Sequence, residues 1–201
     1  MLEINFPSFP TLHTPRLLLR EMTPDDAESL FQLRSNEQAM RYLGRPLQKD
    51  VSEAVEFIEK IRANFAQNEA VAWGIAFHGQ PNLLGNISFW KMDKANHRTE
   101  IGYMLHPDYW GRGIMSEAMA AALEYCFRVL NFHSIEANTD PENEASGRLL
   151  EKHGFVQEAY FRENLYLEGR FLDSRIYSKI NPYHSVHSSD ESKSPEELSK
   201  H

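Results

Sequence analysis

Several short stretches of the chain are rich in apolar side chains, many of them β-branched or aromatic, and are separated by turn-forming residues. Stretches of this length and composition are typical of β-strands. The connections His78–Asn82 and Asp93–His97 are short and polar, which predicts that three of the strands form an antiparallel meander. We expect strands at Arg16–Met22, Ala70–Phe77, Leu83–Trp90, Thr99–His106, Ser134–Asn138, Phe155–Phe161 and Phe171–Lys179.

Four other segments carry apolar residues three or four positions apart, the spacing of one helix face. The first begins at Thr23, where Thr-Pro-Asp-Asp combines a capping residue, a proline in the first turn and two acids. The second begins at Asp50, with Glu53 three positions on as in a capping box. The last spans Glu142–His153 and is ended by Gly154. The longest has on one face Ile114, Ala118, Ala121, Ala122, Tyr125 and Val129.

The predicted order of elements is β-α-α-β-β-β-α-β-α-β-β. Antiparallel strands followed by strand–helix alternation predict an α+β fold with one mixed, largely antiparallel twisted sheet of about six to seven strands and helices on both faces. We assign residues 1–182 to this single domain. Residues 183–201 are polar, serine-rich and charged. They cannot bury enough apolar surface to offset the entropy of ordering, so we expect a disordered tail.

The composition is that of an ordinary globular protein, with 41% hydrophobic and 25% charged residues. No stretch approaches the roughly 20 apolar residues of a membrane span, and the start MLEINFPSFP differs from a signal peptide. The single cysteine, Cys126, excludes an internal disulfide. We therefore expect a cytoplasmic protein without a membrane partner. The net charge of −8 disfavours nucleic acid as a partner and is compatible with a cationic acceptor.

The segment Glu100–Glu117 (EIGYMLHPDYWGRGIMSE) joins a predicted strand to the longest predicted helix. Pro107 ends the strand, and Gly111 and Gly113 allow a tight turn into the helix. A helix N-terminus has unsatisfied N–H donors and roughly half a positive charge, so this turn is a candidate cradle for a pyrophosphate. The alternative for a Gly-x-Gly motif by itself is a connection that binds no ligand.

Two other phosphate-binding loops do not fit. A P-loop requires Gly-Lys-Ser/Thr, which does not occur in the chain. A dinucleotide fingerprint requires three glycines within a unit of parallel strands, whereas the strands before this loop form a meander and the third glycine is missing. A nucleotide-binding protein is therefore disfavoured.

Two blocks of the sequence resemble the GNAT superfamily of N-acetyltransferases, and closely its RimJ/RimL branch. The first block is Glu100-Ile-Gly-Tyr, followed by Pro107-x-Tyr-Trp-Gly-x-Gly and then by Ser116-Glu-Ala. The second is Asn143-x-x-Ser, followed by Glu151-Lys-x-Gly-Phe. The opening Thr-Pro-Arg-Leu-Leu-Leu-Arg is also similar, so the resemblance spans residues 14–180. It implies the GNAT fold and acetyl-CoA as cosubstrate.

The resemblance also implies which residues bind acetyl-CoA. The strand edge at Met104 and Leu105 would pair with the pantetheine arm like an added strand, and an amide near Leu105 would polarise the thioester carbonyl. The pyrophosphate would be bound by loop amides, those of Arg112, Gly113, Met115 and Ser116. Met115 departs from the family, whose loop usually ends in a small residue. The full expected set is Met104, Leu105, Trp110, Gly111, Arg112, Gly113, Ile114, Met115, Ser116 and Asn143.

Acetyl transfer needs a neutral amine and a proton for the departing thiolate. Glu100 is the candidate base, because on the motif strand it faces opposite to Ile101, Tyr103 and Leu105. The alternative is a surface charge or an ion-pair partner. The resemblance favours Ser146 as the acid or as a hydrogen-bond donor to the sulfur, and a serine without a role is the alternative. Many GNAT enzymes use a tyrosine of this helix, which is absent here.

Three further groups of residues have structural alternatives. Asn143 would contact the coenzyme near its thioester, or it simply begins a helix. The aromatic residues on predicted strands indicate core or acceptor-pocket wall: Phe77, Phe89, Trp73 and Trp90. Cys126 lies beside core positions and is expected to be buried and inert. The nine histidines show no convincing metal-ligand spacing outside the tail, so no metal is expected.

The leading interpretation is an acetyl-CoA-dependent N-acetyltransferase of a primary amine, possible acceptors being a protein N-terminus of the ribosomal-protein type and a small amine such as a polyamine, amino acid or antibiotic. A free α-amine has a pKa of about 8 and lysine about 10.4, so an α-amine needs less help from a base. The alternative from another class is a non-catalytic acyl-CoA-binding module, which would need neither Glu100 nor Ser146. The sequence is compatible with a homodimer through exposed strands.

Overall fold

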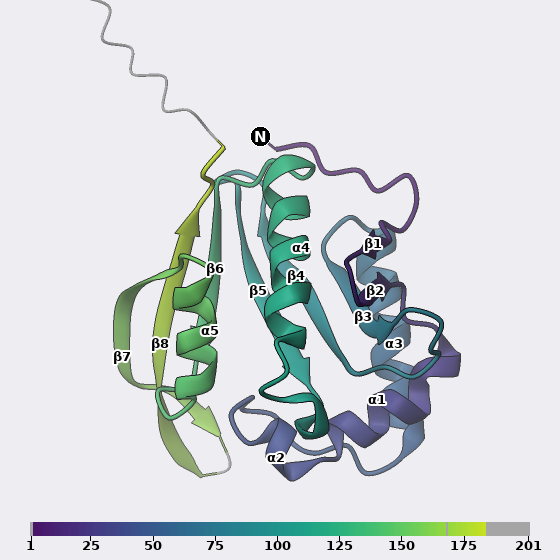
Figure 1. Ribbon diagram of the computed structural model, residues 1–201. Coiled ribbons are helices and arrows are strands. Elements are labelled where there is room, and N and C mark those ends of the chain that lie inside the picture. Colours follow the sequence, from purple (N-terminus) through teal and green to yellow (C-terminus); the bar gives the residue numbers. More distant parts are fainter. Residues whose placement is uncertain (1, 168, 184–201) are drawn as a thin grey trace, which may run out of the picture.

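The computed structural model describes residues 2–167 and 169–183, and within them one mixed sheet forms the centre of the molecule (Figure 1). Its eight strands follow the order β1-β2-β3-β4-β5-β6-β8-β7. Every strand expected from the sequence is present, and β1 is an additional strand that pairs with β2 over only two residues. The strands are β1 (Leu12–His13), β2 (Leu17–Arg20), β3 (Val71–Phe77), β4 (Gly85–Asp93), β5 (Arg98–Leu105), β6 (Ser134–Thr139), β7 (Val156–Leu167) and β8 (Arg170–Ile180).

Helices cover both faces of this sheet, as the sequence predicts (Figure 1). In the view of Figure 1, α4 and α5 lie in front of the sheet, and α1 and α3 pack on its other face. A short helix, α2, was not expected from the sequence; it has only four residues and begins at Asn36, whose side chain accepts a hydrogen bond from the Ala39 N–H. The helices are α1 (Ala27–Arg34), α2 (Glu37–Met40), α3 (Val51–Ala66), α4 (Ile114–Arg128) and α5 (Glu144–Lys152).

The helix starts follow from local hydrogen bonds. Thr23 precedes a single 3-10 turn rather than an α-helical one, and its N–H donates to the Asp26 carboxylate at 2.8 Å. Asp26 is buried and also accepts from the Arg20 guanidinium at 2.7 and 2.8 Å, which ties the start of α1 to the end of β2. Asp50 caps α3 as predicted, since its carboxylate accepts from the Ser52 N–H at 2.8 Å.

The pairing of β5 is the feature of the sheet that matters most for a ligand. β1 to β5 are joined antiparallel, and β4 stays paired with β5 as far as Leu105. The parallel contact of β5 with β6 covers only Arg98–Glu100 and Ser134–Glu136, although β6 remains paired with β8 up to Thr139. Beyond Glu100 the edges of β5 and β6 are therefore separate, and the sheet opens between two strands that are each held firmly on the other side.

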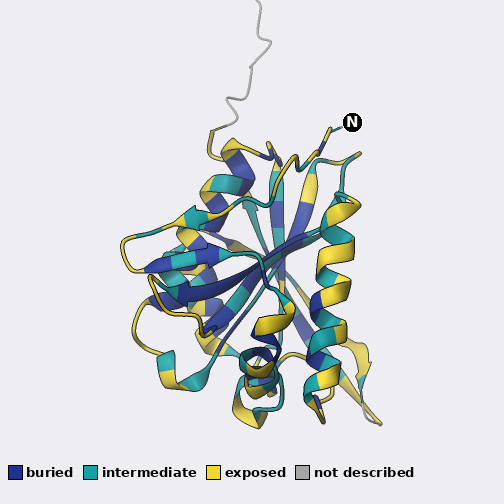
Figure 2. Cartoon of the chain, turned by 90° about the vertical axis from the view of Figure 1, so that its right-hand side faces the viewer, coloured by how far each residue is buried: buried dark blue, intermediate teal, exposed yellow. Residues whose placement is uncertain are grey.

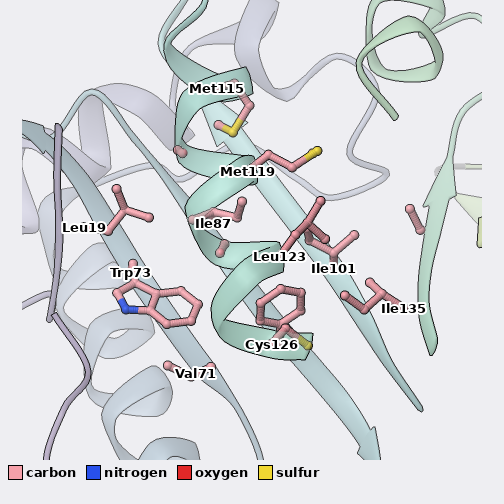
Figure 3. Packing of buried hydrophobic residues seen from close by; sticks show 14 of the residues in the cluster. Leu19, Val71, Trp73, Ile87, Ile101, Met115, Met119, Leu123, Cys126 and Ile135 are labelled. Atoms are coloured by element: carbon pink, nitrogen blue, oxygen red, sulfur yellow. The ribbon is translucent and has the colours of Figure 1, made fainter. Parts of the chain in front are cut away.

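Two apolar cores hold the layers together. The larger lies under α4 and includes residues of β2 to β6 (Figure 3), and the smaller lies under α1 and α3. Figure 2 shows the same arrangement, with buried strands at the centre and helices whose outward faces are exposed. Trp73 and Phe89 are fully buried, and Cys126 is buried in the larger core, which raises the pKa of its thiol. Cys126 is therefore a packing residue, as expected.

The buried face of α4 is wider than the face predicted from the spacing of apolar residues. Relative to that predicted face, it is rotated about the helix axis by about one residue. Val129, expected on this face, lies after the last helical residue and is 59% exposed. Pairs of adjacent residues face the sheet at each turn, because a helix that lies flat on a sheet buries a broad stripe. The buried residues are Ile114, Met115, Ala118, Met119, Ala122, Leu123, Cys126 and Phe127.

The expected tail lies outside the described residues from position 184 onward. Tyr183, its first residue, is described, and the Arg128 guanidinium lies 3.9 Å from the centre of its ring. Asn181 ends the domain with two buried hydrogen bonds from its side chain to the carbonyls of Phe127 and Phe132. In the described part of the chain, none of the helices combines the length and the hydropathy needed to cross a membrane.

Candidate active site

A cleft of about 650 Å³ runs along the opening between β5 and β6. Its walls include the residues of both strands beyond their last pair, together with residues of α5. Residues of the helices between positions 24 and 65 and of the β7–β8 pair also contribute to the lining. Of the strand aromatics, Trp90 lines the cleft, whereas Trp73 belongs to the core.

Strand alternation directs the side chains of β5 to opposite faces of the sheet. Met104 packs in the core under α1 and α3, whereas Ile101 and Leu105 pack in the core under α4. Glu100 has the parity of Met104, and Tyr103 has that of Ile101 and Leu105. Glu100 therefore faces the α1–α3 side and Tyr103 the α4–α5 side, and both line the same cleft.

Glu100 is a buried carboxylate, 8% exposed, with one cationic partner. The Lys91 ammonium lies 2.7 Å from its Oε2, and the Lys91 side chain is 59% exposed. The expectation of an exposed surface charge is excluded, and the ion pair that was the other alternative is present. Glu100 also lines the cleft, so its carboxylate lies at the site where the two strands part.

Tyr103 and Ser146 form a hydrogen-bonded pair on the other face of the sheet. Their hydroxyl oxygens lie 2.6 Å apart, and Ser146 is buried. Burial raises the pKa of Tyr103 to about 12, despite the hydrogen bond from Ser146. Tyr103 is not among the catalytic residues predicted from the sequence. The signal was available, since Tyr103 shares a motif strand with Glu100 and points to the opposite face, but its partner is 43 positions away.

Asn143 and Ser146 belong to the same helix start. Asn143 caps α5, and its side-chain oxygen accepts from the Ser146 N–H at 3.1 Å. Asn143 therefore begins a helix, which was the alternative to a contact with the coenzyme. The residue also lines the cleft. Its cap fixes the position of Ser146 relative to the opening of the sheet.

The loop before α4 has the geometry of an anion cradle. Gly111 and Gly113 have φ of 70° and 73°, a conformation that favours glycine. Gly113 occupies the capping position of α4 and has no side chain to cap the helix, so the amides of the first turn are left for a ligand. A Cβ at Gly113 would lie 3.5 Å from the Arg16 guanidinium, which places a cation beside the loop.

Two residues at the start of α4 can offer a ligand their backbone amides but not their side chains. Ile114 and Met115 are buried in the core under α4, at 2% and 8% exposure. The unusual Met115 therefore does not obstruct the loop. Ser116 lies in the same turn, and its hydroxyl is 2.9 Å from the Nε2 of His153, whose pKa is lowered by burial and by Lys152 and Lys179.

The two residues expected to form the strand edge for the pantetheine arm, Met104 and Leu105, point their amides to opposite sides of β5. The His106 N–H donates to the Leu84 carbonyl on the β4 side. Since amide direction alternates along a strand, the amides of Leu105 and Tyr103 face the opening, and that of Met104 faces β4. The half-exposed Trp110 supports this end of the strand, because its indole N–H donates to the Leu105 carbonyl at 2.8 Å.

Arg112 is exposed on the outer side of the loop. Its carbonyl accepts from the Arg16 guanidinium at 3.0 Å, and Arg16 also pairs with Glu117 in the first turn of α4. The expected cofactor residues thus lie along one path, from the loop to the opening between β5 and β6. Among the residues that the structure describes, no group of three or more His, Cys, Asp or Glu side chains could hold a metal ion.

Comparisons with known proteins agree with this geometry. Residues 16–156 match the family described as Acetyltransferase (GNAT) domain. The uncharacterized N-acetyltransferase YoaA of Bacillus subtilis (strain 168) is 35% identical over 174 residues, which are 87% of this chain and 98% of that protein. The ribosomal protein uS5-alanine N-acetyltransferase of Escherichia coli (strain K12) is 30% identical over 117 residues, 58% of this chain and 60% of that protein.

Solved structures show the same fold. The crystal structure of an acetyltransferase (GNAT family) from Bacillus anthracis has a TM-score of 0.76 to this chain at 27% identity, and the match covers 86% of this chain and 99% of that one. The expected fold is therefore confirmed. The chain belongs to the GNAT family and is an acetyl-CoA-dependent N-acetyltransferase that acts on an amine.

Proposed function

We propose that the acceptor of this enzyme is an α-amine, at the N-terminus of a protein or peptide or on a small molecule, and that acetyl transfer takes place in the opening between β5 and β6. The observation that carries the proposal is that Glu100 and the Tyr103–Ser146 pair reach one cleft from opposite faces of the sheet. An amine and a thioester can then meet between a proton acceptor on one side and a hydrogen-bond donor on the other.

The residues of the loop and of β5 hold acetyl-CoA, which supplies an acetyl group activated as a thioester. The amides at the start of α4 bind its pyrophosphate, with the positive end of the helix dipole adding to the attraction. The amides of Tyr103 and Leu105 face the opening and bind the extended arm as a neighbouring strand would. Of the ten expected residues, Met104 turns its amide toward β4 and is replaced by Tyr103, while Trp110 and Asn143 support the site from outside the loop.

Glu100 accepts the proton of the acceptor amine, directly or through water. Its Oε2 contacts the Lys91 ammonium at 2.7 Å, and Glu100 also lines the cleft where the amine would bind. An α-amine with a pKa of about 8 is already about one tenth neutral at pH 7, whereas under a thousandth of a lysine amine is neutral. An α-amine therefore needs less help from Glu100 than a lysine amine would.

The Tyr103–Ser146 pair donates a hydrogen bond to the departing sulfur. A tyrosine whose pKa is about 12 holds its proton more tightly than a thiol, whose ordinary pKa is about 8.5. Full transfer of the proton from Tyr103 to a thiolate is thus uphill, and a hydrogen bond is the favourable interaction. Of the two roles expected for Ser146, donation of a hydrogen bond to the sulfur is therefore favoured over transfer of a proton as the general acid.

The relative named as a ribosomal protein uS5-alanine N-acetyltransferase supports an acceptor amine on a protein for this chain as well. The acyl-CoA-binding module remains the alternative from another class, and it predicts binding of acetyl-CoA without turnover of any amine. Cytoplasmic location, homodimer formation and the lack of a nucleic-acid or membrane partner stay predictions from the sequence.

The loop is tested by the substitution Gly113→Glu. A carboxylate in the cradle repels the pyrophosphate, so we expect the Kd for CoA, measured by calorimetry, to rise roughly 100-fold, a loss of about 2.7 kcal/mol. Gly79→Glu is the matched control, because Gly79 has φ of 72° and no atom within 4 Å of an added Cβ. Equal affinities of the two variants would place the pyrophosphate elsewhere.

The base is tested by Glu100→Gln. We expect kcat/KM for an α-amine peptide to fall by about 100-fold at pH 7, because the proton acceptor is lost together with its ion pair to Lys91. The Kd for CoA should be unchanged, since the amides of the loop stay in place. Glu136→Gln serves as the control, because Glu136 is the partner of Glu100 in the β5–β6 register and has its own ion pair with Arg98. Full activity of Glu100→Gln would remove this residue from the mechanism.

The Tyr103–Ser146 pair is tested by a double-mutant cycle. Tyr103→Phe and Ser146→Ala are each expected to lower kcat about tenfold, and the double variant is expected to lose little more, because the two hydroxyls act as one unit. Steady-state kinetics at saturating acetyl-CoA give the three values. Fully additive losses, or no loss in Tyr103→Phe, would contradict a shared role at the sulfur.

A further inference from the structure

One wall of the cleft carries positive charge that the rest of the protein leaves unneutralised. Arg34 at the end of α1, Arg45 in the segment after α2 and Lys60 on α3 all line the cleft. The fourth lining cation, Lys91, is paired with Glu100. Across residues 2–167 and 169–183, no carboxylate lies within ion-pair distance of Arg34, Arg45 or Lys60.

Arg34 is the most informative of these side chains. Its guanidinium lies over the ring of Phe57, with Cζ 4.0 Å from the ring centre. Its Nε is buried and, among the described residues, has no hydrogen-bond partner. Burial lowers the pKa of Arg34, and the charge of Arg45 lowers it further. A buried, charged donor without an acceptor costs free energy unless a ligand supplies the acceptor.

The fold brings Arg45 to the same place. The Gln48 N–H donates to the Arg34 carbonyl at 3.1 Å, so the segment that holds Arg45 is tied to the end of α1. Two guanidinium groups that repel each other are held beside one cleft without a carboxylate to separate them. A planar anion between them would relieve this repulsion and accept hydrogen bonds from both.

The carboxylates of the cleft lie on other elements. Glu100 is on β5, and Asp140 follows β6, where its carboxylate accepts from the Glu142 N–H at 2.8 Å. Asp173 on β8 is already bonded by the Tyr160 hydroxyl at 2.5 Å and by the Glu163 N–H at 2.8 Å. The cleft therefore offers a proton acceptor at the opening of the sheet and free cations on the α1–α3 wall. A ligand with an amine at one end and an anion at the other complements both, whereas a polyamine would place positive charge against Arg34 and Arg45.

We infer that the acceptor carries a carboxylate in addition to its reactive amine, and that Arg34 and Arg45 bind this carboxylate. The inference rests on the proposed function, because it assigns the amine end to Glu100. Two sources share this chemistry: a free acidic amino acid, and a peptide whose N-terminal amine is followed by an acidic residue. Arg34 and Arg45 set specificity here, and they take no part in proton transfer.

Binding to the CoA-loaded enzyme tests the inference without requiring turnover. Calorimetry compares two matched pairs of ligands, glutamate α-amide with glutamine α-amide and the amidated peptide Ala-Glu-Gly-Gly with Ala-Gln-Gly-Gly, and adds spermidine as a polycation. Because every one of these four ligands lacks an α-carboxylate, the side-chain carboxylate is the one difference within each pair. We expect the acidic member of at least one pair to bind about tenfold or more tightly than its amide, and the pair concerned identifies the source. Equal binding within both pairs, or tighter binding of spermidine, would overturn the inference.

Charge-neutralising variants assign the effect to the two arginines. Arg34→Met and the exposed Arg45→Met are each expected to remove the tenfold preference while leaving the amide ligand unaffected. Arg45→Met keeps the test valid if the half-buried Arg34→Met is unstable. Arg62→Met is the control on α3, because Arg62 pairs with Glu21 outside the cleft. A preference that survives in Arg45→Met and in folded Arg34→Met would refute the assignment.

Acetylation of the same ligands separates this inference from the proposed function. Turnover of amide and acidic ligands at equal kcat/KM would leave the acetyltransfer proposal standing and remove the carboxylate site. Tight, arginine-dependent binding of the acidic ligand without acetylation would support the carboxylate site and contradict transfer to an α-amine.

Discussion

The separation of β5 from β6 after a single short stretch of parallel pairing is the constraint on which the rest of the site depends. β4 holds β5 on one side and β8 holds β6 on the other, so neither strand can move to close the opening without losing ladder hydrogen bonds. The amides of Tyr103 and Leu105 are left to face the opening rather than another strand. Unpaired amides at the centre of a sheet would be costly if nothing bound there. An extended ligand that supplies the missing hydrogen bonds removes that cost.

Strand alternation then divides the chemistry between the two faces of the sheet. Glu100 and Tyr103 are three positions apart on β5, which sends one side chain toward α1–α3 and the other toward α5. The helices complete each half: α4 begins with free amides beside Arg16, α5 begins with the Asn143 cap that fixes Ser146, and α1 ends with Arg34. In the proposed mechanism, one rigid sheet holds the coenzyme on one side and the acceptor on the other. A small set of polar residues is then enough to position both substrates.

Much of the fold could be predicted from the sequence because its signals are local. The strands β3 to β5 are bounded by polar turns, α3 has the Asp50 cap, and the Gly111–Gly113 turn precedes the longest helix. β1 and α2 were missed, since two and four residues are too few to show a period. The contacts that complete the site are not local. Tyr103 meets Ser146 43 positions on, and Lys91 contacts Glu100 across a strand pair. The charge of Arg34 matters because, within the described part of the chain, no carboxylate folds onto it. Sequence spacing contains no information on such distances, so only the residue types were predictable.

The central claim is that the open edge of β5 and the first turn of α4 are filled together by the coenzyme. Amide hydrogen exchange, followed by NMR with and without saturating CoA, measures this residue by residue. The account predicts that the amides of Tyr103, Leu105, Gly113 and Ser116 exchange about tenfold or more slowly when CoA is bound, while that of Met104, which faces β4, changes little. Slower exchange confined to other parts of the chain, with Tyr103 and Leu105 unchanged, would contradict the account.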